Sequence, residues 1–455
     1  MTVAGDMRAP QHYVLTVLAV TVVLLTSIPA VNIAVDPYGY ARLVGWRPAN
    51  PNDAEASFAA GGAWPAPSGT REAKMLNVAY YQPQSVVFGS STVWSHIDTG
   101  YAPLRGADGR PAFNFGLAGV SLREMEAAFA HVLALRPPAR VLLGLEFYMF
   151  SADKATSPGF FELPMAQRQD YSGQLKRFVS SRLFTAECTF ESQAQLWAPV
   201  TKRLRALAGG RALFRQPGPN FGIGVGAGLR PVDAVSASPG PGRTRDDFLR
   251  LMLDGDRVII SGLYPPPGQP FRFVDDAGWS SLEAVRRMVA LARQHRVDLR
   301  IYLSPHHARA YEAIRLMGWW PKFEAWQRGL VEILAEDAAA HAAEPAIPLW
   351  DFGGYTSVTL DPVVTSVDSA GYSRFHDAIH FATAVGYMVI DRLLPTAAAQ
   401  PMPDDFGVRL TASTVDYHLA AVRQTQQHYG VANQAEVSAV SEMLKSLGRL
   451  PPVAP

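Results

Sequence analysis

The hydrophobic pattern divides the chain into one long apolar stretch near the N-terminus and a body in which short apolar runs alternate with amphipathic segments. From Tyr13 to Val35 the sequence contains no charged residue over 23 positions. At about 1.5 Å per helical residue, this stretch is long enough to cross a hydrocarbon layer of about 30 Å. We therefore expect an uncleaved transmembrane anchor at 13–35. A buried core helix is usually shorter and has a polar face, and a cleaved signal peptide would have a shorter apolar region followed by a small-x-small site.

The charges that flank the apolar stretch predict its orientation. Arg8 and the terminal amine precede it, and Asp36 follows it. The positive-inside rule then places residues 1–12 in the cytoplasm and the body outside it. We expect a single-pass protein of the inner or cytoplasmic membrane with a periplasmic body. Residues 36–83, rich in Pro, Ala and Gly between 47 and 70, are expected to form a linker that leads into the body.

The body is predicted to be an α/β domain. Helical patterns separate the short apolar runs, and two of these helices are announced by Ser–x–x–Glu capping boxes, at Ser121 and Ser280. This alternation is typical of a parallel sheet. The apolar runs predict five parallel strands, at 85–88, 112–115, 140–147, 298–303 and 347–352.

The α/β domain is expected to cover residues 84–395, with an insertion at about 151–256 where the alternating pattern weakens. Within the insertion, 175–183 and 192–207 have helical patterns, and the Gly- and Pro-rich stretch 218–242 is predicted to be a long loop. The tail at 396–455 is predicted to form one or two helices packed on the sheet.

Composition restricts the partners and the redox chemistry. The formal net charge of +1 offers no basic excess for nucleic-acid binding, so no nucleic-acid partner is expected. Cys188 is the only cysteine. A single cysteine excludes an intramolecular disulfide and any CxxC metal or redox site.

Two segments far apart in the sequence carry side chains suited to nucleophilic catalysis. Ser90 and Ser91 follow the predicted strand 85–88, and Asp377 precedes His380 by three positions. A serine hydroxyl needs a base, which histidine provides near neutral pH, and a carboxylate orients that histidine. Because ligands of parallel sheets bind beyond the carboxyl ends of the strands, we expect the two segments to meet there. Taken alone, a serine after a strand is most often a helix cap, and a lone histidine is most often structural. A serine, an acid and a base at the same edge of the sheet are less easily explained by chance.

Further polar residues fall at the same edge of the predicted sheet. Backbone amides near Ser91 and Gly119 are candidates for holding a developing oxyanion, as is Asn114. Glu146, Tyr148 and His307 are possible pocket residues. His306 and His307 are adjacent, so their side chains are expected to diverge. We therefore expect no metal site, with a site completed by Glu146 and Asp377 as the alternative. No other cofactor is expected.

The motifs GSS at 89–91, NFGLAG at 114–119 and DAIH at 377–380 resemble the blocks of the SGNH, or GDSL-like, hydrolase superfamily. This resemblance implies a three-layer, flavodoxin-like domain. It also implies roles for four residues: Ser91 as nucleophile, His380 as base, Asp377 as its orienting acid and Gly119 as an oxyanion donor. Together with the anchor, the blocks are similar to those of envelope-modifying members, including alginate O-acetylation proteins and the D-alanine transfer protein of teichoic acid synthesis.

The sequence departs from the family pattern at two places. Ser90 stands where the common motif has aspartate. The third predicted strand ends in LEFY at 145–148, without the GxND block whose asparagine completes the usual oxyanion hole. Asn114, Tyr148 and His307 are the alternatives for the missing donor.

The resemblance implies a membrane-anchored serine acyltransferase or esterase that acts on O-acyl groups, most simply acetyl groups, of an envelope or secreted polysaccharide. Acyl transfer is preferred over hydrolysis on the same analogy. Envelope biosynthesis proteins would then be partners. The alternative, motivated by the missing GxND block, is a catalytically degenerate scaffold or glycan-binding component of an envelope assembly.

Overall fold

The computed structural model describes most of the chain outside three long gaps. The described residues are 8–36, 41, 46, 71–163, 165, 171–185, 188–190, 192–193, 196–197, 253, 255–257, 259–361, 374–396, 399 and 402–451. The expected linker stretch at 47–70, the loop at 218–242 and most of the helix at 192–207 lie outside them. The chain forms two compact units. Met1–Ser68 and Gln167–Gly228 make the N-terminal unit, and Gly69–Ala166 and Leu229–Pro455 make the α/β unit.

Helix α1 (Arg8–Val35) is the main element of the N-terminal unit. Its residues His12–Val35 form a helix that is long and apolar enough to cross a membrane. The helix ends at Asp36, whose positive φ of 52° turns the chain and whose carboxylate accepts a hydrogen bond from Ala41 N at 2.8 Å. Helix α7 (Tyr171–Arg182) belongs to the same unit. Part of the segment expected to be an insertion in the α/β domain is thus grouped with the N-terminal helix.

The α/β unit is built on a six-stranded sheet. Its strands are β1 (Ser85–Gly89), β2 (Phe113–Gly116), β3 (Arg140–Leu145), β4 (Asp298–Leu303), β5 (Leu349–Asp351) and β6 (Val408–Leu410). The order is β2-β1-β3-β4-β5-β6, in which the first five strands are parallel and β6 is antiparallel to β5. The predicted α/β class and its five parallel strands are confirmed. β6 was missed because three residues, Val-Arg-Leu, are too few to show an alternating pattern.

The helices follow the predicted alternation. They are α4 (Arg71–Tyr81), α5 (Ser91–His96), α6 (Leu122–Leu135), α10 (Ser281–Gln294), α11 (Ala308–Leu316), α12 (Trp320–Ala340), α13 (Thr383–Leu393), α14 (Val415–Ala432) and α15 (Gln434–Ser446). Ser121 and Glu124 form the predicted capping box of α6. The tail is helical as predicted, apart from β6. Helix α4 was not predicted, because we expected residues 36–83 to be a linker.

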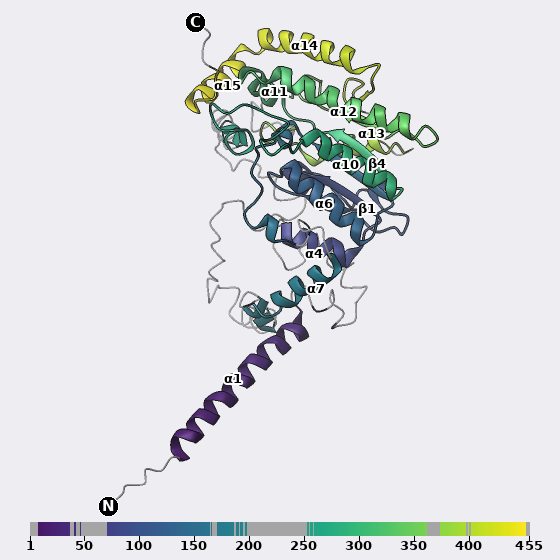
Figure 1. The fold of residues 1–455 in the computed structure, drawn as a ribbon. Coiled ribbons are helices and arrows are strands. Elements are labelled where there is room, and N and C mark those ends of the chain that lie inside the picture. Colours follow the sequence, from purple (N-terminus) through teal and green to yellow (C-terminus); the bar gives the residue numbers. More distant parts are fainter. Residues whose placement is uncertain are drawn as a thin grey trace, which may run out of the picture. The chain divides into compact units, whose positions relative to one another are not determined.

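The helices cover both faces of the sheet. Successive residues of a strand point to opposite faces. Val87 of β1 belongs to the core cluster that includes Val93 of α5 and Val389 of α13. On the opposite face, the ring of Phe88 lies 5.5 Å from that of Phe129 on α6. Helices α6, α10 and α12 lie side by side, each in contact with the next (Figure 1). The sheet is therefore the middle of three layers.

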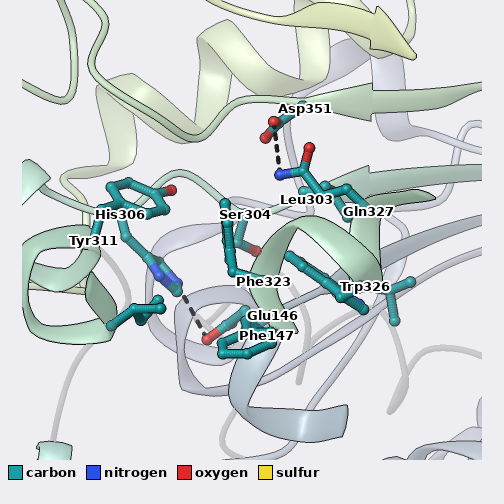
Figure 2. A pocket seen from close by; sticks show the side chains of 12 residues that line it. Glu146, Phe147, Leu303, Ser304, His306, Tyr311, Phe323, Trp326, Gln327 and Asp351 are labelled. Carbon is teal, nitrogen blue, oxygen red and sulfur yellow. Dashed lines mark hydrogen bonds and ion pairs between the residues drawn. The ribbon is translucent and has the colours of Figure 1, made fainter. Parts of the chain in front are cut away.

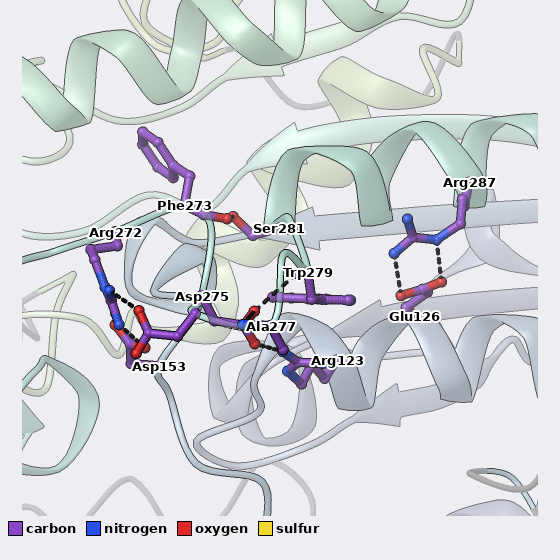
Figure 3. A network of polar contacts seen from close by, with 11 residues as sticks. Arg123, Glu126, Asp153, Arg272, Phe273, Asp275, Ala277, Trp279, Ser281 and Arg287 are labelled. Atoms are coloured by element: carbon purple, nitrogen blue, oxygen red, sulfur yellow. Dashed lines mark hydrogen bonds and ion pairs between the residues drawn. The ribbon is translucent and has the colours of Figure 1, made fainter.

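Charged side chains tie the segment before α10 to its neighbours (Figure 3). Arg272 pairs with Asp153, with a closest contact of 2.7 Å, and Arg287 of α10 binds Glu126 of α6 through two hydrogen bonds of 2.7 and 3.0 Å. Arg123 forms an ion pair with Asp275. Such bidentate pairs fix geometry. The Arg287–Glu126 pair connects α10 to α6, and the Arg272–Asp153 pair connects the segment before α10 to the loop after β3.

The end of β2 lies directly against α5. A Cβ atom added to Gly116 would lie 2.3 Å from Trp94 N and 2.8 Å from Ser90 O. Both of these neighbours are backbone atoms, which cannot move independently of α5. Leu117 N also donates a hydrogen bond of 2.9 Å to Gly89 O. A glycine at 116 thus allows the loop after β2 to lie beside the serine segment.

We predict that Gly116→Ala lowers the free energy of unfolding by about 1–3 kcal/mol, because the added methyl group overpacks a site that has no room for it. Gly262→Ala is the matched control. Gly262 lies in a helical stretch of the α/β unit, and an added Cβ there meets no atom within 4 Å. Thermal unfolding of the detergent-solubilised proteins measures both changes. Equal midpoints for the two variants would contradict the predicted contact.

Candidate functional site

The serine segment is positioned by the end of β1. Ser90 is the N-cap of α5, and its Oγ accepts a hydrogen bond of 3.1 Å from Thr92 N. N-cap serines satisfy amides that have no partner in the first turn. Ser91, the first residue of α5, is only partly buried. One serine therefore holds the turn, and the next presents its hydroxyl.

Ser91, His380 and Asp377 lie in one hydrogen-bonded chain. Ser91 Oγ is 2.8 Å from His380 Nε2, and His380 Nδ1 is 2.5 Å from Asp377 Oδ2. The carboxylate facing Nδ1 assigns the imidazole proton to Nδ1, so that Nε2 is free to accept from the serine hydroxyl. The structure thus brings together the three residues that the sequence singled out, although 289 positions separate Ser91 from His380.

The local electrostatics favour a charged His380. Burial by itself lowers the pKa of His380, but the hydrogen bond and negative charge of Asp377 outweigh it and raise that pKa above its ordinary value of 6.5. The same pairing holds the pKa of Asp377 below its ordinary value, against the opposite effect of burial. Asp377 is therefore ionised at neutral pH and stabilises an imidazolium at His380.

The loop that carries Asp377 and His380 is held by hydrogen bonds on both sides. Asp377 Oδ1 accepts from the backbone amides of Ile379 and His380 at 2.8 and 2.7 Å. Asp256 accepts from Ala378 N at 2.8 Å and pairs with Arg309 of α11. These contacts fix the carboxylate in place before any ligand binds.

Two further histidines lie beside the triad and were not identified in the sequence. The ring of His96, at the end of α5, lies 5.5 Å from that of His380 and 5.3 Å from that of His376. Burial, followed by the nearby charges of His380 and His376, lowers the pKa of His96 to about 3. His96 is therefore neutral at physiological pH and packs against His380 without repelling its charge.

Glu146 is a buried carboxylate behind the serine segment. Its Oε1 accepts hydrogen bonds from Ser90 Oγ and, at 2.8 Å, from Thr92 Oγ1. Its Oε2 lies 3.3 Å from Nε2 of His306. Burial raises the pKa of Glu146, but His306 and the two hydroxyls together hold that pKa below its ordinary value. Glu146 thus binds the first turn of α5 and places a negative charge beneath Ser91.

A small cavity opens on the other side of Glu146 (Figure 2). His306, Ser304 and Gln327 contribute polar groups to its wall, and Phe323 and Trp326 contribute rings. It leaves about 10 Å³ of free volume, about enough for one water molecule. This cavity is too small for an acyl group or a sugar. A substrate would have to reach Ser91 from its solvent-facing side.

The oxyanion candidates differ in whether their N–H groups already have a hydrogen-bond acceptor. Gly119 lies in the loop after β2 with a φ of +60°, a conformation that favours glycine. Within the described part of the chain, no acceptor is recorded for the amides of Ser91 and Gly119. The side chain of Asn114, by contrast, donates to Val93 O at 2.8 Å and accepts from Gly116 N at 2.9 Å. Asn114 thus joins β2 to the C-terminal end of α5, away from Ser91.

The two remaining alternatives for a third donor are placed differently. His307 caps α11 through Nδ1, and its Nε2 contacts the backbone oxygen of Asp361 at 2.9 Å, so its ring is committed to backbone groups and does not line the cavity. Tyr148 is buried, and among the described residues its hydroxyl has no hydrogen-bond partner. Burial, together with the charge of Glu146, raises the pKa of Tyr148 well above its ordinary value. Its hydroxyl therefore keeps its proton.

No protein-family model, curated protein or solved structure matches this chain. Within the described residues, no group of three or more His, Cys, Asp or Glu side chains is arranged to hold a metal ion. The chemistry of the site therefore has to be argued from its own geometry.

We predict that Asp377→Asn lowers the pKa of the His380 imidazole, because the variant loses the negative charge that favours the protonated ring. NMR titration of the histidine side chains measures this shift. Asp98→Asn is the control, since Asp98 binds Gly100 N and the hydroxyl of Tyr387. An unchanged His380 titration in Asp377→Asn would contradict the assigned pairing.

We predict that Glu146→Gln lowers the free energy of unfolding by about 1–3 kcal/mol at pH 7, because the neutral amide loses the His306 contact and buries an unmatched donor. The folded-state pKa of Glu146 is depressed. Its stabilising effect is therefore present above the unfolded pKa, near 4.5, and is lost as the pH falls below that value. Urea unfolding at pH 7 and pH 4 should show that the difference between wild type and variant narrows in acid. A difference independent of pH would argue against an ionised Glu146.

Proposed function

We propose that this chain is a membrane-anchored serine acyltransferase or esterase with an extracytoplasmic body. The observation that carries the proposal is the hydrogen-bonded chain from Ser91 Oγ through His380 to Asp377. Serine, histidine and a carboxylate in this order form a catalytic triad, in which the histidine activates the serine and the carboxylate orients the histidine. The geometry supports acyl-group chemistry at the hydroxyl of Ser91.

In the proposed reaction, Ser91 Oγ attacks the carbonyl carbon of an acyl ester while His380 Nε2 takes the hydroxyl proton. Asp377 stabilises the resulting imidazolium. The tetrahedral intermediate collapses when His380 returns the proton to the departing alcohol oxygen, which leaves an acyl group on Ser91. His380 then deprotonates an incoming hydroxyl, which attacks the acyl-serine. When the second tetrahedral intermediate collapses, the bond between the acyl carbon and Ser91 Oγ breaks and His380 returns the proton to Ser91 Oγ. If that hydroxyl belongs to a sugar the reaction is transfer, and if it belongs to water the reaction is hydrolysis.

The resemblance to SGNH hydrolases supports the same assignment. The parallel strands follow the order 2-1-3-4-5, which also occurs in flavodoxin-like sheets, and this order supports the flavodoxin-like arrangement that we propose from the resemblance. At the carboxyl edge of this sheet, Ser91 follows β1 and Gly119 follows β2. The 377–380 loop lies at the same edge, because His380 contacts Ser91. The amides of Ser91 and Gly119 are the proposed oxyanion donors. The envelope or secreted polysaccharide, with its O-acetyl groups, is proposed from the resemblance to envelope-modifying members.

The proposed membrane topology follows from α1 and its flanking charges. Residues 1–12 would lie in the cytoplasm and the α/β unit in the periplasm, where envelope polysaccharides are modified. Other envelope biosynthesis proteins are the proposed partners.

A binding role without turnover is the second candidate. It is favoured by the missing GxND block after β3, where the chain has the buried carboxylate of Glu146, and by the commitment of the Asn114 and His307 side chains to backbone groups. Covalent labelling by a fluorophosphonate discriminates the two candidates, because only an activated serine reacts with it. Labelling at Ser91 would argue against the binding role.

We predict that Ser91→Ala lowers the turnover of an activated acetyl ester on the order of 10⁴-fold, because it removes the nucleophile. Ser95→Ala is the matched control on the same helix and should retain activity. Wild-type activity should rise with pH as His380 loses its proton, with an inflection above 6.5 because its pKa is raised. Full activity of Ser91→Ala, in a variant that unfolds at the wild-type temperature, would refute the proposed nucleophile.

A further inference from the structure

The segment around residues 183–197 is bound to the C-terminal end of α1 within the N-terminal unit. Asn32, on the last turn of α1, is fully buried. Its Nδ2 donates to Leu183 O at 2.8 Å and to Thr189 Oγ1 at 3.0 Å. These two hydrogen bonds join positions about 150 residues apart. The segment is therefore held at the level of Asn32 along the helix.

This level corresponds to the edge of the apolar span. The span ends at Val35, three residues after Asn32. At about 1.5 Å per residue, Asn32 lies about 4.5 Å inside that end. In a bilayer entered by α1, this is the depth at which hydrocarbon meets the lipid headgroups. The segment bound to Asn32 is then at the membrane surface.

Large apolar side chains of this segment are exposed. They are Phe184, Phe190, Leu196 and Trp197, which are 59%, 72%, 56% and 61% exposed, and we call them the interfacial patch. The small or short side chains between them, Cys188 and Ser192, are buried. The large side chains thus face outward while the small ones fill the interior. Exposed clusters of this kind mark an interaction surface.

We propose that the interfacial patch inserts into the headgroup region of the same bilayer that α1 crosses. Aromatic side chains are enriched at this depth, where an apolar ring is taken out of water without entering the hydrocarbon centre. Lys176 and Arg177 are exposed on α7, the helix that precedes the patch in the sequence. They supply cations for lipid phosphates.

A lipid surface fits the patch better than a second copy of the chain or another protein. The patch is continuous, through the Asn32 hydrogen bonds, with a helix whose own apolar side chains are exposed along its length, such as Val20 at 53%. A bilayer that covers α1 reaches the patch without any further partner. Attachment at both α1 and the patch restricts rotation of the N-terminal unit about the axis of α1, which a single helix does not.

The test uses the full chain reconstituted in phosphatidylcholine–phosphatidylglycerol vesicles, with an environment-sensitive fluorophore on a single introduced cysteine. Phe190→Cys reports on the patch. Tyr417→Cys, an equally exposed aromatic position (82%) on α14 of the α/β unit, reports on water, and Val20→Cys gives the deep reference within α1. The wild-type protein, whose Cys188 is fully buried, serves as the labelling blank.

We expect the label at 190 to emit at shorter wavelength than the label at 417 and to lose most emission with lipids brominated near the headgroup. The label at 20 should be quenched most by bromines near the acyl-chain ends, and the label at 417 by neither lipid. A label at 190 as water-exposed as that at 417 would overturn the proposal. A label at 190 that is shielded but insensitive to brominated lipid would overturn it too, because a protein would then cover the patch. A label at 20 that neither brominated lipid quenches would also overturn the proposal, because α1 would then not cross the bilayer. None of these outcomes depends on acyl-transfer activity.

Discussion

The site depends on the hydrogen bond between Ser91 and His380, because it joins two parts of the chain that no local interaction brings together. A serine hydroxyl is a weak nucleophile unless a base accepts its proton. The structure maintains this contact from both ends. On one side, Ser90 caps α5 and Gly116 lets the loop after β2 lie against the helix. On the other side, Asp377 accepts two backbone amides of its own loop as well as the imidazole proton. The three side chains are therefore held in position by contacts within the folded chain.

Glu146 gives the site its most unusual electrostatic feature. A buried carboxylate is costly unless its oxygens are paired. Here Ser90, Thr92 and His306 supply the partners. The same carboxylate fixes the turn that presents Ser91 and adds to the negative potential that favours a protonated His380. Glu146 thus acts on both the position of the serine turn and the charge of His380.

The N-terminal unit combines two chain segments that are separated by much of the α/β unit. Helix α1 supplies an apolar surface. Residues 167–228 come much later in the sequence but belong to the same unit. Asn32 connects them through its buried Nδ2, which donates both hydrogen bonds, while among the described residues its Oδ1 has no hydrogen-bond partner. This polar residue, near the end of a helix that is long and apolar enough to cross a membrane, thus has a structural role. Helix α1 is accordingly part of a small folded unit with its own polar contacts.

The hydrophobic pattern by itself determined the α/β class, the five parallel strands, the long apolar helix and the capping box of α6, because strand and helix periods and caps are local properties. It also singled out Ser91, Asp377 and His380, since their residue types carry the chemistry. Sequence did not predict β6, helix α4 or the return of residues 167–228 to α1, since short strands and long-range packing leave no local period. Nor did the sequence decide which of Asn114, Tyr148 and His307 could replace the missing oxyanion donor. Only the tertiary structure decided that Asn114 and His307 bind backbone groups, that His96 lies against His380, and that Glu146 supports the serine turn, because each of these contacts joins residues brought together by the sheet.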